Sequence, residues 1–416
     1  MTVTAATTKW AEGASASPTT RKSGEKTTGI HVTSNFDSGN IDVVAISDPA
    51  QHGFHSVDVR IHPDPYCESD KAEHFQWFYF RVSNCKDEEL QVNITNAGKA
   101  SYTDGWKGYN VCASFDKQHW FRVSTTYDAE RGVLSWTHVP GKGAVYYAYF
   151  APYTYERHQS LVAELQCHEL VELEMVGETL DGHDLDVLRV GTPGPGKRTV
   201  WVVARQHPGE SMAEWFAEGM LRRLLDRHDA TSRKLLQETV FYVVPNINPD
   251  GTWRGHLRTN AAGANLNREW AHPCLDRSPE VYLVREKMEE TGCDMLVDVH
   301  GDEALPYNFV VGNHGIPSWG PRLAGLHDSF SSAFQSASPD FQTRYGYGTD
   351  SPGRANMKLC SKHVGERFDC LAVTLEMPFK DTADSPDPLQ GWSPERAARL
   401  GGSMLDAVLA VVPQLR

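Results

Sequence analysis

The stretch Thr199-Val-Trp-Val-Val-Ala-Arg-Gln-His-Pro-Gly-Glu210 decides the fold of this chain. Residues 199–205 are mostly apolar and rich in valine, which predicts a strand that is buried on both faces. His207 and Glu210 follow that strand within a Pro-Gly turn, and residues 211–227 then place apolar side chains at helical spacing. A buried strand that leads through a turn into a helix is typical of an α/β sheet.

Further strands and helices alternate along the second part of the chain. Residues 239–244, 295–299 and 371–375 have the composition of buried strands, and residues 281–290 have that of a helix. The alternation predicts an α/β domain over 158–416, with a mixed, partly parallel sheet flanked by helices.

The chain before this domain has a different pattern. Short β-branched and aromatic stretches recur about every ten residues between Gly, Asp, Asn and Lys, which predicts an all-β sandwich domain over 39–157. These stretches are 57–61, 75–82, 90–94, 109–115, 120–126, 133–139 and 145–150. Residues 1–38 are rich in Ser, Thr, Ala and Gly, so we expect a disordered tail there.

Composition excludes several classes of partner. The 416 residues carry a formal net charge of −14 without a basic stripe, which argues against a nucleic-acid partner. We expect no membrane partner, because no apolar run is long enough to span a bilayer. The eight cysteines stand singly and the N-terminus does not resemble a secretory signal, so a cytoplasmic location is expected.

Three short motifs resemble known sites but fit them poorly. Residues 191–198 approach a phosphate-binding loop, but a strand follows where a helix is required. His168-Glu169 lacks the second histidine of a helical zinc motif. Gly209-Glu-Ser-Met-Ala213 approaches the nucleophile turn of serine hydrolases and stays open as a rival, with Ser211 as the nucleophile.

A candidate metal site lies at the ends of two predicted strands. His207 and Glu210 are three residues apart in one turn, and His300 closes the strand 295–299. Each residue alone is compatible with a solvated or hydrogen-bonded strand end. Together they form a His/Glu/His set that leaves one position open, as in catalytic zinc sites.

Other polar residues follow the same strands. Glu376 ends the last strand, where a carboxylate can take a proton from water and return it to a leaving amine. Arg258, Asn267 and Arg268 follow a dense turn signal at 246–251, and arginine suits a carboxylate or a developing oxyanion. Read singly, Glu376 could also form an ion pair at the strand end, and the arginines could also be solvated loop residues.

In this order, the residues resemble the zinc metallocarboxypeptidases of the funnelin type, with HxxE, Arg, Asn-Arg, His and a late Glu. The stretches Phe75-Gln-Trp-Phe-Tyr-Phe80 and Phe150-Ala-Pro-Tyr-Thr-Tyr155 are similar to those of the cytosolic carboxypeptidase branch. That branch places a β-sandwich domain before its catalytic domain, and the resemblance covers the chain from about residue 40 onward.

The resemblance implies a role for each residue. His207, Glu210 and His300 would hold one zinc ion per chain, and Glu376 would be the general base and then the general acid. Arg258 would stabilise the oxyanion, and the pair Asn267 and Arg268 would grip the terminal carboxylate of the substrate.

Specificity and support follow from the same resemblance. Gly353-Arg354 matches the segment that lines the pocket for the last side chain, so acidic C-terminal residues, glutamate above all, are the expected substrates. A family tyrosine near the reaction centre matches Tyr347 in preference to Tyr345. Asn265 stands where digestive relatives carry an aspartate that orients a zinc-bound histidine, which leaves Asn265, Asp298 and Asp302 as candidates for that role.

The expected function is therefore a zinc-dependent metallocarboxypeptidase that acts on the C-terminal tails of peptides or proteins. Two alternatives stay open: a zinc-dependent deacylase or amidase on the same fold, and an inactive module that binds protein tails. The sequence does not distinguish removal of gene-encoded residues from trimming of post-translational glutamate chains.

Overall fold

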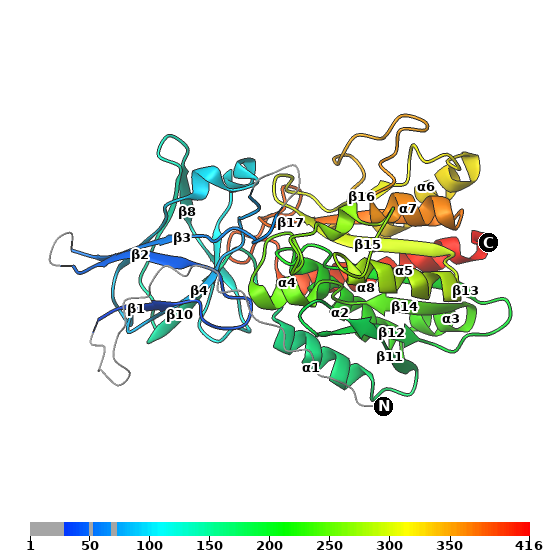
Figure 1. The fold of residues 1–416 in the computed structure, drawn as a ribbon, viewed down its shortest axis with the longest axis horizontal. Helices are drawn as coiled ribbons and strands as arrows, with labels where there is room; N and C mark the ends of the chain where they lie inside the picture. The colour runs from blue at the N-terminus through cyan, green and yellow to red at the C-terminus, as the bar shows by residue number, and fades with distance from the viewer. Residues whose placement is uncertain (1–28, 50–52, 68–72) are drawn as a thin grey trace, which may run out of the picture.

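A computed structural model describes residues 29–49, 53–67 and 73–416 of the protein. Figure 1 shows two bodies side by side, an all-β N-terminal part and a larger part in which helices flank one sheet. The N-terminal part contains two five-stranded sheets, and the larger part contains a seven-stranded sheet. This arrangement confirms the predicted fold class.

The N-terminal sheets pack face to face through alternate residues. Strand β5 (Leu90–Ile94) buries every second side chain, and the phenyl ring of Phe78 stacks on the indole of Trp136 from the other sheet. The sheet orders are β1-β4-β10-β6-β7 and β2-β3-β5-β9-β8. The remaining bounds are β1 His31–Thr33, β2 Asp42–Ser47, β3 His55–Arg60, β4 Tyr79–Ser83, β6 Val111–Ser114, β7 Phe121–Val123, β8 Thr125–Asp128, β9 Val133–His138 and β10 Ala144–Ala148, with the short 3-10 helices η1 Ala97–Lys99 and η2 Thr103–Trp106.

The ordered chain starts earlier than predicted. Strand β1 pairs with β4 in antiparallel register, inside the range 1–38 that the sequence assigned to a disordered tail. Ile30 and Val32 are buried in the hydrophobic core, which explains why so short a segment joins the sheet. The rest of the predicted tail, residues 1–28, lies outside the described residues.

A helix crosses the predicted domain boundary between residues 157 and 158. Helix α1 (Tyr155–Leu165) begins after Thr154, whose hydroxyl accepts a hydrogen bond from the backbone N–H of Arg157. Its buried residues Leu161, Val162 and Leu165 belong to the same core cluster as the sheet strands and the N-terminal strands. The two parts of the chain are therefore joined through a continuous core.

The seven-stranded sheet has the order β11-β12-β14-β13-β15-β17-β16. Strands β14, β13, β15 and β17 are parallel to one another, and the other three are antiparallel to their neighbours. The bounds are β11 Val171–Glu178, β12 Asp184–Val190, β13 Arg198–Ala204, β14 Thr239–Val244, β15 Met295–Asp302, β16 Phe309–Gly312 and β17 Leu371–Pro378, with α2 Met212–Leu224, α3 Ala230–Glu238, α4 Pro249–Arg254, α5 Pro279–Thr291, α6 Pro321–Ala337, α7 Cys360–Arg367, α8 Pro394–Val411, η3 Leu266–Arg268 and η4 Val412–Gln414.

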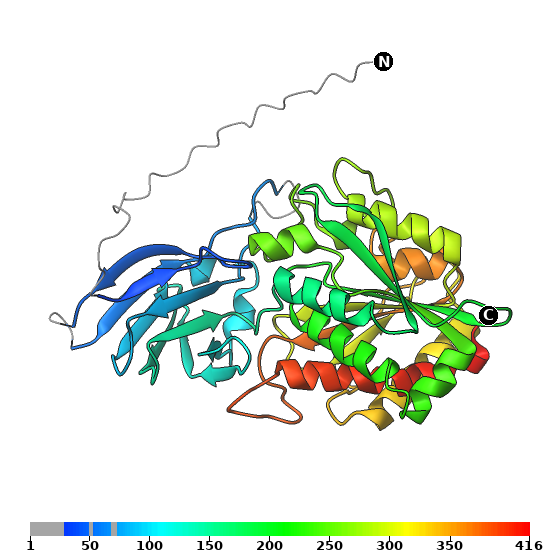
Figure 2. The same cartoon turned by 90° about the horizontal axis from the view of Figure 1, so that it is seen from below.

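Helices cover both faces of this sheet, as the apolar composition of its strands predicts. In β13, Val200 and Val202 belong to the core that contains α2, α6 and α8, whereas Trp201 and Val203 belong to the core that contains α5 and α7. Figure 2 shows the sheet between these two helical layers. None of the helices described has the length and apolar character that a bilayer crossing requires.

The carboxyl ends of the central parallel strands meet at one edge of the sheet. His300 in β15 lies directly beside Glu376 in β17, and His207 follows the end of the adjacent β13. This edge faces the N-terminal domain, since the Arg122 guanidinium donates to the carbonyl oxygen of Phe379 just after β17, at 2.9 Å. Tyr149 stacks on the same Phe379 ring.

Candidate active site

His207, Glu210 and His300 form a compact buried cluster at this edge. The Nδ1 atom of His207 lies 2.7 Å from one carboxylate oxygen of Glu210, and the Nδ1 atom of His300 lies 2.8 Å from the other. The two Nδ1 atoms are 3.2 Å apart. Two imidazole nitrogens and a carboxylate that converge in this way offer the donor set of a catalytic zinc site.

The opposite nitrogen of each imidazole meets an acceptor. Nε2 of His207 lies 3.0 Å from the Oδ1 atom of Asn265, and Nε2 of His300 lies 3.0 Å from the Oδ2 atom of Asp298. Gln206 donates to the other oxygen of Asp298 at 2.7 Å. Both imidazoles thus present Nδ1 to the cluster, which is how protein groups orient metal-binding histidines.

Loss of the Asn265 acceptor is expected to weaken metal binding. We expect Asn265→Leu to reduce zinc affinity by about 10–100-fold, because His207 would lose the partner that fixes its ring. Competition with a chromophoric chelator measures the affinity. Asn265→Asp keeps an acceptor at this place and should retain tight binding, whereas wild-type affinity in Asn265→Leu would contradict the role of this amide.

The pKa values of the two histidines in the cluster shift in opposite directions. Burial lowers the pKa of His207 to about 3, and the nearby Arg258 acts in the same direction. Burial also disfavours a charged His300, but the Asp298 and Glu210 carboxylates outweigh it and raise the pKa of His300 well above its usual range. The two imidazoles therefore lie in opposite electrostatic surroundings, although both face the Glu210 carboxylate.

A buried arginine supports the turn that carries His207 and Glu210. Arg205 has a φ of 63°, a left-handed conformation that is uncommon for residues other than glycine. Its Nε atom donates to the carbonyl oxygen of Pro208 at 3.0 Å, and its Nη1 atom donates to Glu214 in α2 at 2.7 Å and to the carbonyl oxygen of Tyr153. The ligand turn is thereby tied to α2 and to the segment before α1.

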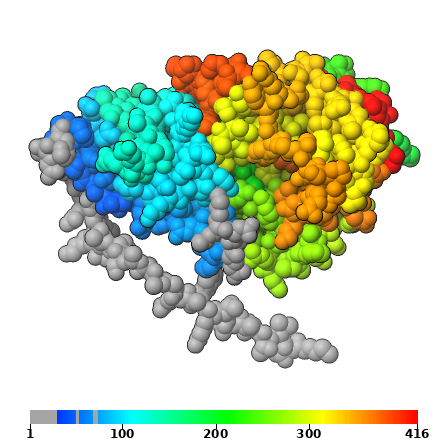
Figure 3. Space-filling view, turned by 90° about the horizontal axis from the view of Figure 1, so that it is seen from above, coloured from blue at the N-terminus to red at the C-terminus, as the bar shows by residue number. Residues whose placement is uncertain are grey.

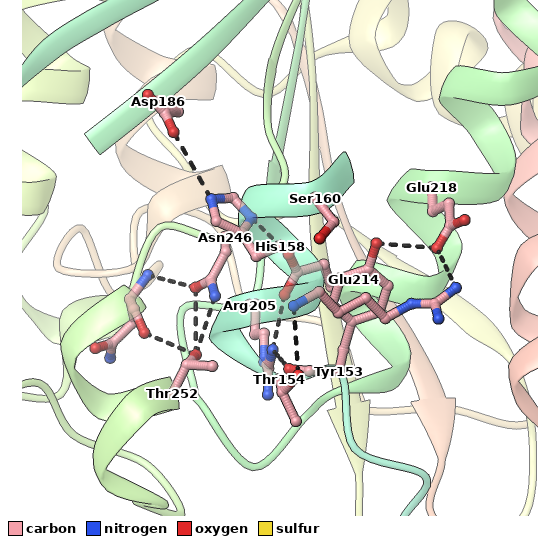
Figure 4. A network of polar contacts seen from close by, with 12 residues as sticks. Tyr153, Thr154, His158, Ser160, Asp186, Arg205, Glu214, Glu218, Asn246 and Thr252 are labelled. Carbon is pink, nitrogen blue, oxygen red and sulfur yellow. Dashed lines mark hydrogen bonds and ion pairs between the residues drawn. The ribbon is translucent and has the colours of Figure 1, made fainter. Parts of the chain in front are cut away.

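Figure 4 shows how this network continues away from the turn. The second carboxylate oxygen of Glu214 lies 2.7 Å from Nδ1 of His158 in α1, and the Tyr153 hydroxyl donates to Glu218 at 2.9 Å. Arg157 donates to the same Glu218 oxygen at 3.1 Å. Because the Arg205–Glu214 pair is buried, removal of either partner would leave an uncompensated charge beside the turn.

Glu376 lines a cavity of about 340 Å³ together with the three clustered residues. The side chain is 8% exposed, and its Oε2 atom has no hydrogen-bond partner among the described residues. Burial, and then the neighbouring carboxylates, raise the pKa of Glu376 well above its usual range. An unpartnered carboxylate beside the cluster is suited to accept and return a proton.

Arg258 reaches the cavity from a loop that the N-terminal domain holds. The Asp64 carboxylate accepts hydrogen bonds from the backbone N–H groups of Leu257, Arg258 and Thr259 at 2.7–2.9 Å. The Arg258 guanidinium lies 5.7 Å from the centre of the Tyr102 ring, which also lines the cavity. Two residues of the N-terminal domain therefore shape the position of this cation.

Asn267 and Arg268 both line the cavity, from η3. The Asn267 side chain is buried and accepts a hydrogen bond from the backbone N–H of Cys360, the first residue of α7, at 2.8 Å. Arg268 is exposed, and its Nη1 atom donates to the Asn267 carbonyl oxygen at 2.7 Å. A fixed amide and an exposed guanidinium thus lie side by side at the cavity wall.

Of the two candidate tyrosines, the structure brings Tyr347 to the cavity. Its hydroxyl donates to Asp302, which also accepts from the backbone N–H of Ala304. Tyr345 instead stacks on Tyr307, with ring centres 4.4 Å apart, and does not line this cavity. Asp302 is therefore occupied by Tyr347 and by backbone groups, whereas Asn265 and Asp298 contact the histidines.

The structure does not place Arg354 at the cavity, contrary to the expectation from the sequence. Arg354 is exposed in a turn before α7, whereas the buried Lys362, inside that helix, lines the cavity. The Lys362 ammonium donates to the carbonyl oxygens of Gly312 and His314 and pairs with Asp350 at 2.8 Å. The specificity role of Arg354 stays a prediction, and Lys362 is a second candidate that the structure brings to the cavity wall.

Sequence reasoning missed other residues of the cavity wall, in particular Tyr102 and Glu303. Glu303 directly follows the Asp298-Val-His-Gly-Asp302 segment, so its place beyond the strand end was a usable signal. Tyr102 offered none, since it lies in another domain. Ser211, the nucleophile of the rival hydrolase interpretation, is fully buried and donates to the Ala151 carbonyl oxygen, which makes it unsuited to attack a substrate.

A second group of possible metal-binding side chains lies elsewhere in the described chain, formed by Asp181, His183 and Asp250. Asp250 accepts from the Thr179 hydroxyl and lies 2.8 Å from Nδ1 of His183. Asp181 forms a two-point ion pair with Arg254, at 2.7 Å for each contact. These contacts account for all three side chains without a metal ion.

Two histidines and a glutamate that converge at the carboxyl edge of an α/β sheet, beside a buried carboxylate and two arginines, define a metal-dependent hydrolase. Comparison with protein families narrows this class. Residues 159–382 match the family described as zinc carboxypeptidase, and residues 32–150 match the cytosolic carboxypeptidase N-terminal domain. The chain belongs to the zinc carboxypeptidase family, whose members depend on zinc, and it is a metallocarboxypeptidase.

Individual relatives agree with this assignment. An uncharacterised protein of Zymomonas mobilis is 44% identical over 93% of this chain and 97% of its own length. Cytosolic carboxypeptidase 6 of Caenorhabditis elegans is 26% identical over 86% of this chain and 81% of its own length. The structure of a metallo-carboxypeptidase from Pseudomonas aeruginosa, in complex with (2-guanidinoethylmercapto)succinic acid, is 42% identical with a TM-score of 0.88, over 93% of this chain and 100% of that one.

Proposed function

We propose that this metallocarboxypeptidase holds one zinc ion with His207, Glu210 and His300 and prefers peptides that end in an acidic residue, above all glutamate. The observation that carries the metal assignment is the convergence of both Nδ1 atoms on the Glu210 carboxylate, with an acceptor behind each imidazole. When bound, zinc would polarise the scissile carbonyl group and make water acidic enough to be deprotonated near neutral pH.

The side chains around the cluster supply the remaining chemistry. Glu376 takes the proton from the attacking water and delivers it to the leaving amine, for which its unpartnered oxygen beside the cluster is suited. Arg258 stabilises the negative charge that develops on the carbonyl oxygen. Tyr347 lines the cavity, where its hydroxyl donates a hydrogen bond to Asp302. In the proposed reaction Tyr347 contacts the substrate near the reaction centre.

Asn267 and Arg268 make the reaction specific for a chain end. Their amide and guanidinium lie side by side at the cavity wall, an arrangement that suits the two oxygens of a free α-carboxylate. A deacylase or amidase that acts on substrates without this carboxylate would not need the pair. The pair therefore favours an exopeptidase over that alternative and over a binding module without catalysis.

The acidic preference rests on Lys362 in place of Arg354. The buried ammonium already pairs with the Asp350 carboxylate, whose side chain is 41% exposed in the loop before α7. A substrate carboxylate that enters the cavity would replace Asp350 as the third partner of this ammonium. The two carbonyl contacts from Gly312 and His314 hold Lys362 in place meanwhile.

The test compares two peptides with a blocked N-terminus and a free C-terminus. They differ only in the C-terminal residue, which is glutamate in one and glutamine in the other. We expect release of free glutamate, and a value of kcat/KM about 10–100-fold higher for the glutamate peptide, since a hydrogen bond between charged groups contributes about 1.5–3 kcal/mol. Lys362→Met should remove most of this ratio. Arg354→Ala, the matched control, should keep it.

Hydrolysis of the glutamine peptide serves as an internal control for each variant, because it reports whether the variant retains carboxypeptidase activity. Loss of the ratio in Arg354→Ala alone would reinstate the exposed arginine as the selective residue. A wild-type ratio near one would refute the acidic preference. The ligand of the Pseudomonas relative carries a guanidino group as well as a succinate, so a peptide that ends in arginine belongs in the same series as the rival substrate.

A further inference from the structure

The residues that line the cavity come from two parts of the molecule. One group comes from β16, β17 and α7, where the Ser361 hydroxyl lies 2.8 Å from that of Thr374 and Lys362 donates to Gly312. The other group is Tyr102, Arg258 and Glu303, at the side of the N-terminal domain. Figure 3 shows a hollow between the cyan N-terminal domain and the yellow and orange segments that follow β15.

The proposed function assigns a different part of the substrate to each group, and the inference below rests on it. If the terminal residue lies between Arg268 and Lys362, its scissile bond reaches the cluster of His207, Glu210 and His300. The residue before that bond then lies on the other side, among Tyr102, Arg258 and Glu303. This second group therefore contacts the penultimate side chain.

Glu303 supplies the carboxylate of that group. Its side chain is 7% exposed, and apart from its own backbone N–H its carboxylate has no hydrogen-bond or ion-pair partner among the described residues. Burial raises the pKa of Glu303 to about 8, with Glu210 acting in the same direction and Arg258 opposing it. The neighbouring Asp302, by contrast, is occupied by Tyr347 and by backbone groups.

The N-terminal domain fixes the position of Glu303. The glycine at 105 allows close approach, because a Cβ atom there would lie 3.0 Å from the carbonyl oxygen of Glu303 and 3.1 Å from its Cβ. Tyr102, three residues earlier, is held by its backbone N–H, which donates to the Gln76 side chain at 2.8 Å. Glu303, which lines the cavity, therefore lies directly against the N-terminal domain.

We propose that Glu303 is a specificity-determining residue that pairs with a cationic side chain, lysine or arginine, on the penultimate residue of the substrate. Arg258 is the nearby cation, but no direct ion pair joins it to Glu303 among the described residues. A buried carboxylate without a direct partner is unfavourable, and a substrate cation would supply one. An acidic penultimate residue would meet Glu303 as a like charge. The enzyme would accordingly remove a single terminal glutamate after a basic residue and shorten runs of glutamate poorly.

Three tetrapeptides with a blocked N-terminus and a free C-terminus test this inference. They end in Lys-Glu, Leu-Glu and Glu-Glu, and kcat/KM for release of the last residue is measured for each. We expect wild-type protein to favour Lys-Glu over Glu-Glu by at least about tenfold, and Glu303→Gln to reduce that ratio to within a few-fold of one. Glu286→Gln makes the same chemical change on the exposed face of α5 and should keep the wild-type ratio.

The outcomes separate this inference from the proposed function on which it rests. Release from all three peptides at similar rates, or faster release from Glu-Glu, overturns the role of Glu303, and the wild-type ratio alone decides this if Glu303→Gln fails to fold. A lysine preference that persists in Glu303→Gln also overturns it. Release from none of the peptides refutes the proposed acidic preference, and the present inference with it.

Discussion

Glu376→Gln is expected to reduce kcat by about 10²–10⁴-fold, the range that general acid–base catalysis contributes. Glutamine keeps the size of the side chain but can neither take a proton from water nor return it to the leaving amine. The effect should fall on kcat more than on KM, because Glu376 lies beside the cluster and not beside the proposed terminal-carboxylate contacts. Steady-state kinetics on the glutamate-terminated peptide measure both constants.

Two controls keep this result specific. Zinc content per chain should stay the same in Glu376→Gln, since Glu376 is not one of the three clustered donors. The unfolding temperature should also stay close to that of the wild-type protein. A variant that retains zinc and wild-type kcat would exclude Glu376 as the proton carrier and point to another group of the cavity.

Removal of the metal is expected to abolish activity and to lower stability. Dialysis against a chelator should leave no measurable release of amino acid, and one equivalent of zinc per chain should restore it. Zinc that binds only the folded chain stabilises it by about 4 kcal/mol at a concentration a thousand times its Kd, so the unfolding temperature should rise when zinc returns. His300→Ala should reproduce the metal-free protein.

The second group of possible donors offers a matched control for the metal experiment. His183→Ala removes an imidazole from the group of Asp181, His183 and Asp250, which is not expected to hold the catalytic ion. Metal analysis should therefore find one zinc per chain in the wild-type protein and in His183→Ala, but almost none in His300→Ala. Activity that survives complete metal removal would contradict the proposed chemistry.

Local pattern predicted the parts of the fold whose sequences are strongly periodic or continuously apolar. Strand β14 lies at the predicted residues 239–244, and β5 lies at 90–94. Weakly apolar elements were not predicted, among them α1 and the edge strand β11. No residue of β11 is buried, so its sequence lacks a buried-strand signal. Their position depends on packing partners that are distant in the sequence.

The same distinction holds for the site. The residues at strand ends, His300 and Glu376, were predictable because parallel strands bring their carboxyl ends to one edge. Lys362 was not, since its place depends on where α7 begins, and the sequence between Arg354 and Glu376 allows several registers. Tyr102 depends on how two domains meet, which no pattern within either domain records.

The three hydrogen bonds that the Asp64 carboxylate accepts from consecutive backbone N–H groups bear on whether the two domains can function separately. The loop of Arg258 belongs to the hydrolase half of the chain, yet the carboxylate that shapes it belongs to the sandwich half. We therefore expect the pair of domains, and not the hydrolase half alone, to be the smallest unit that keeps the geometry of the Arg258 loop.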